Sequence, residues 1–515
     1  MNNHYRTIVI GGGLSGLVAA LNLAERGLAP LVIESEPRFG GRFSAKETVT
    51  LTAQGRDWQF PAEHGIHGIW GQYNNLRAVM GRYAIATDLV PAKQEEWLHG
   101  EGRVMHAEAG SMVRLSPIPA PFHYIGLLAR PRFLAMLTLQ DLIGLPRTVG
   151  SIYLALAYDP LMEPAPLEGR TLKELFHRWP PRLRAFISSL LRSGLAAHPE
   201  DVPLNGFLAF MRFYTLLRRD AWVFDYFPAD SGSFLIDPLV AKLQALGGTT
   251  QCNTSATRVE RTATGWRIFW KETEGAGEGS VEADQVVVAL DAPAAQKIFT
   301  TSPATAKEAV TLQWPRGLAT GVVRLWFDTV PNTAVESGIC SGDLIIDNFF
   351  WLHRFQRAVT EWHAATGGSV VESHIYGPQL LLDQPDAALL AQAISDIYRA
   401  YPELRGHLLH STLQRNIASH TRFEVGASPS YLGVESPWAG ISCCGDWVRY
   451  SHPALFLERA CVTGIAAANR VLHATGLPTY EVLPVRPPEA PAAAIQWMLR
   501  GVRRIVARLG AKKKR

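Results

Sequence analysis

The sequence has few cysteines, no long apolar run and almost no excess of either charge. Its five cysteines are scattered over 515 residues and form no C-x-x-C pair, so neither a disulfide framework nor a zinc site is indicated. We therefore expect a reducing, cytoplasmic compartment and no bound metal. No uninterrupted apolar segment reaches the ~20 residues that a spanning helix needs, and the strand-like residues 7–10 leave no room for a signal peptide.

The small net charge also limits the kind of partner. A formal charge of +4 is too low for a protein that reads nucleic acid, and much of the positive excess falls at the C-terminal end. A composition of 47% hydrophobic and 19% charged residues is typical of globular proteins. Because the chain is longer than one core usually covers, we expect two domains.

A glycine-rich turn near the N-terminus carries the first functional signal. Residues 7–10 read as a strand, an apolar helical pattern follows, and residues 31–33 read as a second strand. The turn fits G-x-G-x-x-G, a pattern that brings the backbone close to a pyrophosphate at a helix N-terminus. The carboxylate after the second strand can accept hydrogen bonds from the hydroxyl groups of a ribose. The expected nucleotide contacts are Gly11, Gly13, Leu14, Ser15, Gly16 and Glu34. The alternative is a βα turn without a ligand.

Two further elements separate FAD from NAD, which the turn alone does not. Gly41-Arg42 follows soon after the second strand, and its guanidinium can hydrogen-bond a pyrophosphate bidentately. Gly445-Asp446 ends a strand near the C-terminus, where a carboxylate can accept from ribityl hydroxyls, and the helix expected from residue 457 directs its N-terminal dipole at a reduced flavin. Each element, taken alone, is also compatible with an ordinary turn.

The order of these elements resembles the superfamily of FAD-dependent amine oxidases and carotenoid (phytoene) desaturases. Within it, AEHGIHGIWGQYNNL at residues 62–76 is similar to the E-x-G-x-H…G-x-Y-x-N-L segment of phytoene and ζ-carotene desaturases. Together with HPALFLERA at residues 452–460, it most resembles isorenieratene-synthase-type β-carotene desaturase/methyltransferases. IHGIW at residues 66–70 departs from the Phe-rich pattern of that subfamily.

The resemblance implies an α/β (α+β) fold, with a Rossmann-type FAD-binding domain of the glutathione-reductase/amine-oxidase type and an inserted mixed α/β substrate domain. We assign residues 1–88, 229–292 and 429–475 to the FAD domain, and 89–228 and 293–428 to the substrate domain. Residues 476–515 are expected to form a Pro/Ala-rich linker and a basic amphipathic helix. The implied contacts of a non-covalent FAD include Gly41, Arg42, Gly65, Ile66, Ala256, Gly445, Asp446 and Ala460.

No catalytic side chain is predicted firmly, because the flavin itself carries the electrons. His64 and His67 are the polar candidates near the flavin, since an imidazole can relay a proton. The alternative for each is a buried histidine bonded to the backbone.

Two segments indicate the environment. Residues 122–156 are unusually apolar and form either a substrate entrance in a bilayer or ordinary core helices. The C-terminal pattern predicts an interfacial helix that attaches the protein peripherally to a membrane surface. Its apolar face would carry Ile495, Met498, Leu499, Val502, Ile505, Val506 and Leu509, with Arg500, Arg503, Arg504 and Arg508 largely elsewhere and a basic end at Lys512–Arg515.

The sequence thus predicts an FAD-dependent oxidoreductase that acts on the CH–CH groups of a hydrophobic polyene, first of all a carotenoid, by desaturation, isomerisation or ring aromatisation. Its electrons would pass to a quinone or to oxygen. One alternative is an amine or protoporphyrinogen oxidase, against which stands the lack of an aromatic-rich segment before Gly445, although Tyr431 and Trp438 are near. The other is a non-catalytic, prenyl-protein-binding module of the escort type.

Overall fold

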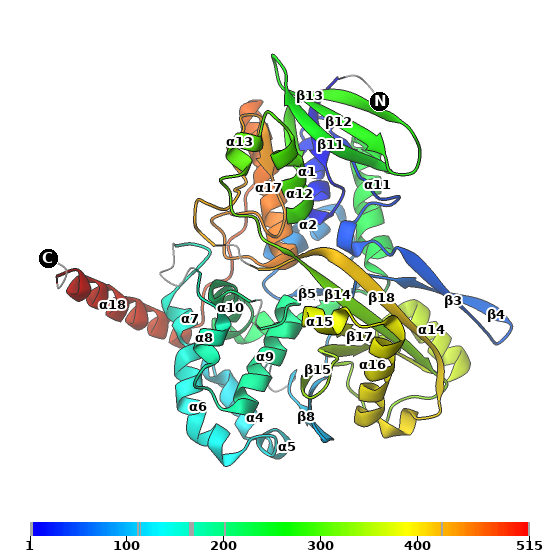
Figure 1. Cartoon of the computed structure of the whole chain (residues 1–515), viewed down its shortest axis with the longest axis vertical. Coiled ribbons are helices and arrows are strands. Elements are labelled where there is room, and N and C mark those ends of the chain that lie inside the picture. Colours follow the sequence, from blue (N-terminus) through cyan, green and yellow to red (C-terminus); the bar gives the residue numbers. More distant parts are fainter. Residues whose placement is uncertain are drawn as a thin grey trace.

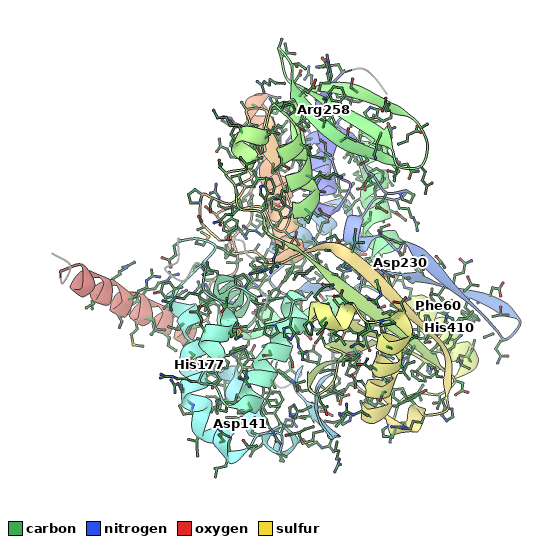
Figure 2. All side chains as sticks on the ribbon, in the orientation of Figure 1. Phe60, Asp141, His177, Asp230, Arg258 and His410 are labelled. Atoms are coloured by element: carbon green, nitrogen blue, oxygen red, sulfur yellow. The ribbon has the colours of Figure 1, made fainter. Side chains whose placement is uncertain are left out.

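The computed structural model describes residues 4–110, 113, 115–163, 169–199, 202–423 and 426–512, with side chains as far as residue 505. Two seven-stranded sheets and a group of helices make up the described part of the chain. The first sheet lies at one end of the molecule, and the second sheet and the helices lie side by side at the other end (Figure 1). Figure 2 shows the same division, with Arg258 on the first sheet, His410 on the second, and Asp141 and His177 among the helices.

The first sheet has the order β10-β2-β1-β13-β12-β11, and β19 pairs with β13. Its central strands are parallel and almost continuously apolar, as expected of strands buried on both faces, whereas β11, β12 and β13 form an antiparallel meander. The strands come from three blocks that lie far apart in the sequence. They are β1 (His4–Ile10), β2 (Leu31–Ile33), β10 (Thr249–Gln251), β11 (Thr254–Arg261), β12 (Trp266–Glu272), β13 (Glu278–Val288) and β19 (Ile441–Cys443).

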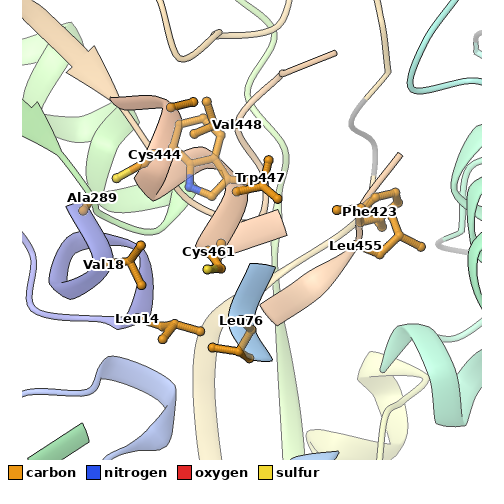
Figure 3. Packing of buried hydrophobic residues seen from close by; sticks show 14 of the residues in the cluster. Leu14, Val18, Leu76, Ala289, Phe423, Cys444, Trp447, Val448, Leu455 and Cys461 are labelled. Carbon is orange, nitrogen blue, oxygen red and sulfur yellow. The ribbon is translucent and has the colours of Figure 1, made fainter. Parts of the chain in front are cut away.

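Close packing of two helices joins the first block to the last. Helix α1 (Leu14–Ala24) lies against α17 (Phe456–Ala474), and Figure 3 shows Val18 of α1 near Cys461 of α17 and Leu76 of α2 (Asn74–Tyr83). Gly464 makes the approach possible, because a Cβ at this position would lie 2.5 Å from the backbone oxygen of Ser15. Helices α11 (Asp237–Ala245), α12 (Ala292–Thr301) and α13 (Ala306–Ala309) complete this part.

The second sheet has the order β18-β14-β17-β16-β15-β7-β8. Helix α16 (Asp386–Ala400) packs its apolar side on this sheet, with α14 (Arg357–Thr366) and α15 (Gln379–Leu382) nearby. The strands are β7 (Glu95–Glu101), β8 (Arg103–Glu108), β14 (Gly317–Phe327), β15 (Ser337–Gly342), β16 (Asn348–Trp351), β17 (Ser369–Ile375) and β18 (Leu408–Thr421).

The third part consists of helices, and two small sheets pack instead against the second sheet, in one apolar cluster with Trp326 and Val359. Its helices are α4 (Ile125–Leu128), α5 (Pro131–Leu134), α6 (Leu139–Ile152), α7 (Leu154–Ala157), α8 (Leu172–Phe176), α9 (Pro181–Leu195) and α10 (Leu204–Phe210), which continues as a π-helix through Leu216. The small sheets pair β3 (Glu47–Ala53) with β4 (Arg56–Ala62), and β5 (Gly68–Trp70) with β9 (Phe224–Tyr226) and β6 (Val90–Pro91).

The C-terminal helix α18 (Ala490–Lys512) extends from the body beside α7 (Figure 1). The expected apolar face of this helix is covered in part, because one edge of it packs on the body and the other edge stays exposed. Ile495 and Leu499 pack on the core, whereas Met498, Val502 and Ile505 are exposed together with Trp497. The side chains of Val506 and Leu509, and residues 513–515, lie outside the described part. Among the described residues, no helix is long and apolar enough to cross a membrane.

The α/β fold class predicted from the sequence is confirmed, and the domain boundaries remain a prediction. Residues 122–156, expected to form either a substrate entrance in a bilayer or core helices, contain both buried and exposed apolar side chains. Leu127, Phe133 and Leu156 are buried, whereas Leu139 and Ile143 are each 74% exposed.

The α1–α17 contact leads to a stability prediction. Replacing Gly464 with Ala should lower the free energy of unfolding by about 1–3 kcal/mol, because the new methyl group meets backbone that cannot rotate away. Gly81→Ala is the matched control. It lies within exposed α2 with nothing near its Cβ position, so alanine should raise stability by roughly 0.5–1 kcal/mol through helix propensity. Chemical denaturation of both variants checks this, and equal midpoints would contradict it.

Candidate active site

A cavity of about 620 Å³ lies where the first sheet, the second sheet and the helices meet. On one side it is bordered by the β1–α1 turn, the ends of β2 and β13, and the segment that follows β19. On the other side it is bordered by one face of the second sheet, from β14 to β18. The carboxyl ends of parallel strands are where α/β sheets bind their ligands, so this cavity is the candidate site.

Most of the residues predicted from the sequence line this cavity. They are Gly11, Gly13, Leu14, Ser15, Glu34, Gly41, Arg42, His64, Gly65, Ile66, His67, Gly445, Asp446 and Ala460. Gly16 lies behind the lining, where a Cβ would be 2.1 Å from the oxygen of Gly11, so it serves the close packing of α1 on the sheet. Ala256 lies in β11 and does not contribute to the lining.

The turn between β1 and α1 places bare backbone against the cavity. Gly11 has a φ of +106°, and a Cβ there would lie 2.6 Å from the oxygen of Ala289, so the turn requires glycine. Gly13, the N-cap of α1, has nothing within 4 Å of its Cβ position. Amide groups of a helix N-terminus therefore face open space, which is the arrangement that a pyrophosphate requires.

Glu34 is held in place by hydrogen bonds from three groups. Its Oε2 accepts from the amide of Gly12 at 2.7 Å, and its Oε1 accepts from Ser35 Oγ at 3.1 Å and from the amide of Glu36 at 2.9 Å. The side chain is buried at the end of β2 and still borders the cavity. A carboxylate fixed in this way is a preorganised acceptor for the hydroxyl groups of a ribose.

Arg42 and Asp446 form an ion pair that joins distant parts of the chain. Arg42 Nη2 donates to Asp446 Oδ2 at 2.6 Å, and Nη1 lies 3.3 Å from Nδ1 of His420. The ring of His420 donates through Nε2 to the oxygen of Leu195 at 2.9 Å, which leaves Nδ1 free to accept from Arg42. Burial, and then the charge of Arg42, lowers the pKa of His420 to about 4, so this imidazole is neutral near pH 7.

His64 and His67 lie beside the same arginine. Burial, followed by the charge of Arg42, lowers the pKa of His64 well below its usual value and that of His67 to about 3. Within the described part of the chain, His64 Nε2 and His67 Nδ1 have no hydrogen-bond partner, so bonding to the backbone does not account for these two atoms. The ring of His67 stacks on Phe43 at 4.3 Å. Both are neutral imidazoles with a nitrogen left for a ligand.

The second sheet adds polar residues that sequence analysis missed. Glu372, His374 and Tyr376 alternate along β17 and the residues after it, and the last two line the cavity. Asn416 of β18 donates to the oxygen of His64 at 2.8 Å and so ties this sheet to the 64–67 segment. The available signal was the alternation of polar residues in an otherwise apolar strand, V-V-E-S-H-I-Y, which marks one face of a strand.

A second cavity of about 240 Å³ adjoins the first, and the two share Glu95, Trp222 and Ile339 in their linings. Its walls come from α4, α5, α6 and α9 together with β7, and they are almost wholly apolar. An apolar chamber thus meets a more polar one at a neck of three side chains. A molecule that occupied both would be long, with a hydrocarbon portion.

These features together fit a flavin nucleotide. Open backbone at Gly13, the fixed carboxylate of Glu34, the Arg42–Asp446 pair and the unpartnered ring nitrogens of His64 and His67 border one continuous cavity. The fold and the site are those of an oxidoreductase with a dinucleotide-type cofactor site.

The profile of the flavin containing amine oxidoreductase family matches residues 14–472, and the chain belongs to this family. Its cofactor is therefore a flavin, and the expectation of an oxidoreductase is confirmed. The carotenoid phi-ring synthase of Streptomyces griseus is 26% identical over 91% of this chain and 88% of its own length. That of Chlorobaculum tepidum is 22% identical over 90% and 88%. The 15-cis-phytoene desaturase of Arabidopsis thaliana is 26% identical over 55% of this chain and 47% of its own length.

Solved structures agree on the fold. Cyclohexylamine oxidase from Brevibacterium oxydans superimposes with a TM-score of 0.65 at 15% identity, covering 92% of this chain and 99% of its own. Putrescine oxidase bound to putrescine gives 0.64 at 14% identity, covering 91% and 99%. At such low identity the agreement concerns the fold alone.

The position of Glu34 leads to a prediction about flavin content. Glu34→Gln should lower the affinity for flavin by about tenfold or more, because a hydrogen bond to a charged acceptor contributes about 1.5–3 kcal/mol. The amide oxygen can still accept from Gly12, whereas the bonds from Ser35 and Glu36 are lost because the NH2 group cannot accept. Glu282→Gln, which removes a partly exposed carboxylate from β13 of the same sheet, is the control. Flavin absorbance per mole of purified protein is the measurement, and undiminished content in Glu34→Gln would contradict the assignment.

Proposed function

We propose that the protein is an FAD-dependent oxidoreductase that oxidises CH–CH groups of a carotenoid, with the end ring as its target. The observation that carries this proposal is the share of the chain that aligns with each relative. The two phi-ring synthases align over about nine-tenths of the chain, whereas the phytoene desaturase aligns over about half. Similarity along nearly the whole chain supports the ring chemistry of the phi-ring synthases over desaturation of the open chain.

The cavities support a long hydrophobic substrate. The apolar chamber between α6 and α9 can hold a hydrocarbon chain, and its neck at Trp222 and Ile339 leads to the chamber beside Gly65. One end of such a substrate would then meet the flavin while the rest stays in apolar surroundings. Burying a polyene removes a large apolar surface from water, which favours binding at about 25 cal/mol for each Å².

The flavin that we propose is FAD, held without a covalent bond. Glu34 would accept from the ribose, Arg42 and the amides after Gly13 would hold the pyrophosphate, and Asp446 would accept from the ribityl chain. None of the five cysteines, all within the described residues, lines the cavity, so no thiol is placed to form a thioether to the ring. When bound, the flavin supplies the two-electron oxidant. Release of free FAD on acid precipitation is the outcome expected from non-covalent binding.

Amine oxidation is the second candidate, because two of the structural neighbours are amine oxidases. The aromatic residues that could have formed an amine cage do not support it. Trp438 stacks on Phe299 at 4.2 Å and, like Tyr431, does not line the cavity. The non-catalytic escort alternative is not carried further, since the chain belongs to an oxidoreductase family.

Expression in bacteria that accumulate β-carotene should produce pigments with altered end rings, detected by chromatography and absorption spectra of the extracts. A strain that accumulates acyclic lycopene is the matched control and should show no new pigment, because it offers no ring. Glu34→Gln should reduce the new pigment in step with its flavin content. Unchanged pigment in the β-carotene strain, with flavin bound to the protein, would contradict carotenoid oxidation, and conversion of lycopene would redirect the proposal to chain desaturation.

We further propose that the protein attaches to a membrane surface through α18 and α6. Trp497 and Ile505 of α18 are 80% and 59% exposed, and Leu139 and Ile143 of α6 are each 74% exposed. Both helices lie on the same side of the molecule (Figure 1), and α6 also borders the apolar chamber. An apolar helix face combined with basic residues is typical of interfacial helices.

The double variant Trp497→Ser/Val502→Ser should lower sedimentation with phosphatidylglycerol vesicles by at least about tenfold, since two exposed apolar side chains no longer enter the interface. Neither residue packs on the core, so flavin content should be unchanged. Leu409→Ser is the control, because Leu409 is 56% exposed on β18, away from α18. Equal sedimentation of wild type and the double variant would contradict attachment through α18.

A further inference from the structure

Four polar side chains form a connected row on the face of the second sheet that borders the cavity. Arg324 of β14 donates through Nε and Nη2 to Oε2 of Glu372, at 3.0 and 2.6 Å. The other oxygen of Glu372, Oε1, lies 2.9 Å from Nε2 of His374. Nδ1 of His374 lies 2.7 Å from the hydroxyl of Tyr376. The row therefore runs from a buried ion pair to a phenol at the cavity wall.

The charge of Glu372 decides which way each hydrogen bond points. Burial alone would keep this carboxyl protonated, but the charge of Arg324 and the bond from His374 lower its pKa to about 2, so it is ionised and can only accept. His374 must then carry its proton on Nε2 and donate it to Glu372. Its Nδ1 has a lone pair and accepts from the hydroxyl of Tyr376. The amide of Ile66 also points at Nε2, from 3.4 Å, but the shorter contact with the charged acceptor Glu372, at 2.9 Å, is the stronger one and keeps the proton on Nε2.

The end of this row faces the place where substrate and flavin are expected to meet. His374 lies directly behind Gly65, where a Cβ would be 3.1 Å from Nε2, and Gly65 has a φ of +146°. His374 and Tyr376 both line the large cavity, and Ile339, at the neck of the apolar chamber, lies in the same sheet. Ile339 pairs with Asn348 across the sheet, and Asn348 pairs with His374, so we expect a substrate end that enters through the neck to arrive near His374 and Tyr376.

We propose that Tyr376 is a catalytic residue that takes the proton lost by the substrate, and that His374 and Glu372 are the positioning residues that make it a base. This inference rests on the proposed oxidation of a carotenoid. Each CH–CH group that becomes C=C loses one hydride and one proton. A bound flavin would supply the oxidation by taking up the hydride, and the proton would pass to the oxygen of Tyr376. At the same time the phenol proton would move to Nδ1 of His374. The electron pair of the C–H bond that loses its proton would form the new double bond.

His374 differs from the other histidines at the cavity in the charge of the group beside it, and this charge matters for the transfer of a proton. A proton that arrives on His374 forms an imidazolium beside the carboxylate of Glu372, which stabilises the new charge where little water is present. His64, His67 and His420 lie beside the cation of Arg42, which disfavours a second positive charge. The sheet therefore provides a proton acceptor that the segment containing His64 and His67 does not.

The test compares Tyr376→Phe with Ser373→Ala in the full-length, flavin-loaded protein, with β-carotene in phosphatidylglycerol vesicles as substrate. The first variant removes only the hydroxyl, and the second removes the hydroxyl of a β17 residue that does not line the cavity. Without oxygen, reduction of the flavin by the substrate should slow about 100-fold in Tyr376→Phe, the usual contribution of a general base. The affinity for β-carotene and the flavin content should stay within about twofold in both variants, as expected when an interaction made only in the transition state is lost.

Rescue separates a proton-accepting role of His374 from a structural one. His374→Ala should lose flavin reduction to a similar extent and regain part of it when imidazole is added, whereas Tyr376→Phe should not respond to imidazole. If wild type and Ser373→Ala reduce their flavin with β-carotene and Tyr376→Phe does so equally fast, the inference is overturned while the proposed function stands. If wild type fails as well, with flavin bound, the proposed function falls and the inference falls with it.

Discussion

The parallel pairing of β13 with β1 on one side and with β19 on the other is the constraint on which the site depends. It brings the carboxyl ends of three strands to one sheet edge, although their residues are hundreds of positions apart in the chain. The turn at Gly11 then lies against Ala289, and Gly445 follows β19 directly. Every predicted nucleotide contact that lines the cavity depends on this edge or on a segment packed against it.

The α1–α17 contact and the Arg42–Asp446 pair keep this arrangement together from two sides. The two helices pack the first block against the last, and they can approach closely because Gly464 has no side chain. Burial of their apolar faces supplies the stabilising free energy. The ion pair adds a link at the cavity wall, with Asp446 largely buried and Arg42 about one-third exposed. If Arg42 binds the pyrophosphate as we propose, its guanidinium would contact a second anion besides Asp446.

The sequence was sufficient to predict residues that line the cavity beside the first sheet, because the signals for them are local. A G-x-G-x-x-G turn between a strand and a helix can be recognised within thirty residues, and the glycines at 41 and 445 each follow an apolar strand. Ala256 was assigned from the resemblance alone and lies outside the cavity lining. The faces of α18 could not be predicted from periodicity, because which of its apolar residues are covered depends on a distant helix, α7. Propensity and pattern do not contain that information.

The row on the second sheet was missed for a related reason. In the sequence, Glu372 and His374 are two ordinary polar residues of a strand. Their partner Arg324 lies nearly fifty residues earlier, and only the β14–β17 register places it beside Glu372. That register decides the chemistry, because the charge of Arg324 keeps Glu372 ionised and Glu372 in turn determines the proton position on His374. Arg42 acts in the opposite sense on His64, His67 and His420. Arg42 thus adds to the effect of burial in keeping three histidines at the cavity neutral, whereas Arg324 keeps the carboxylate beside His374 ionised, and both effects follow from tertiary structure alone.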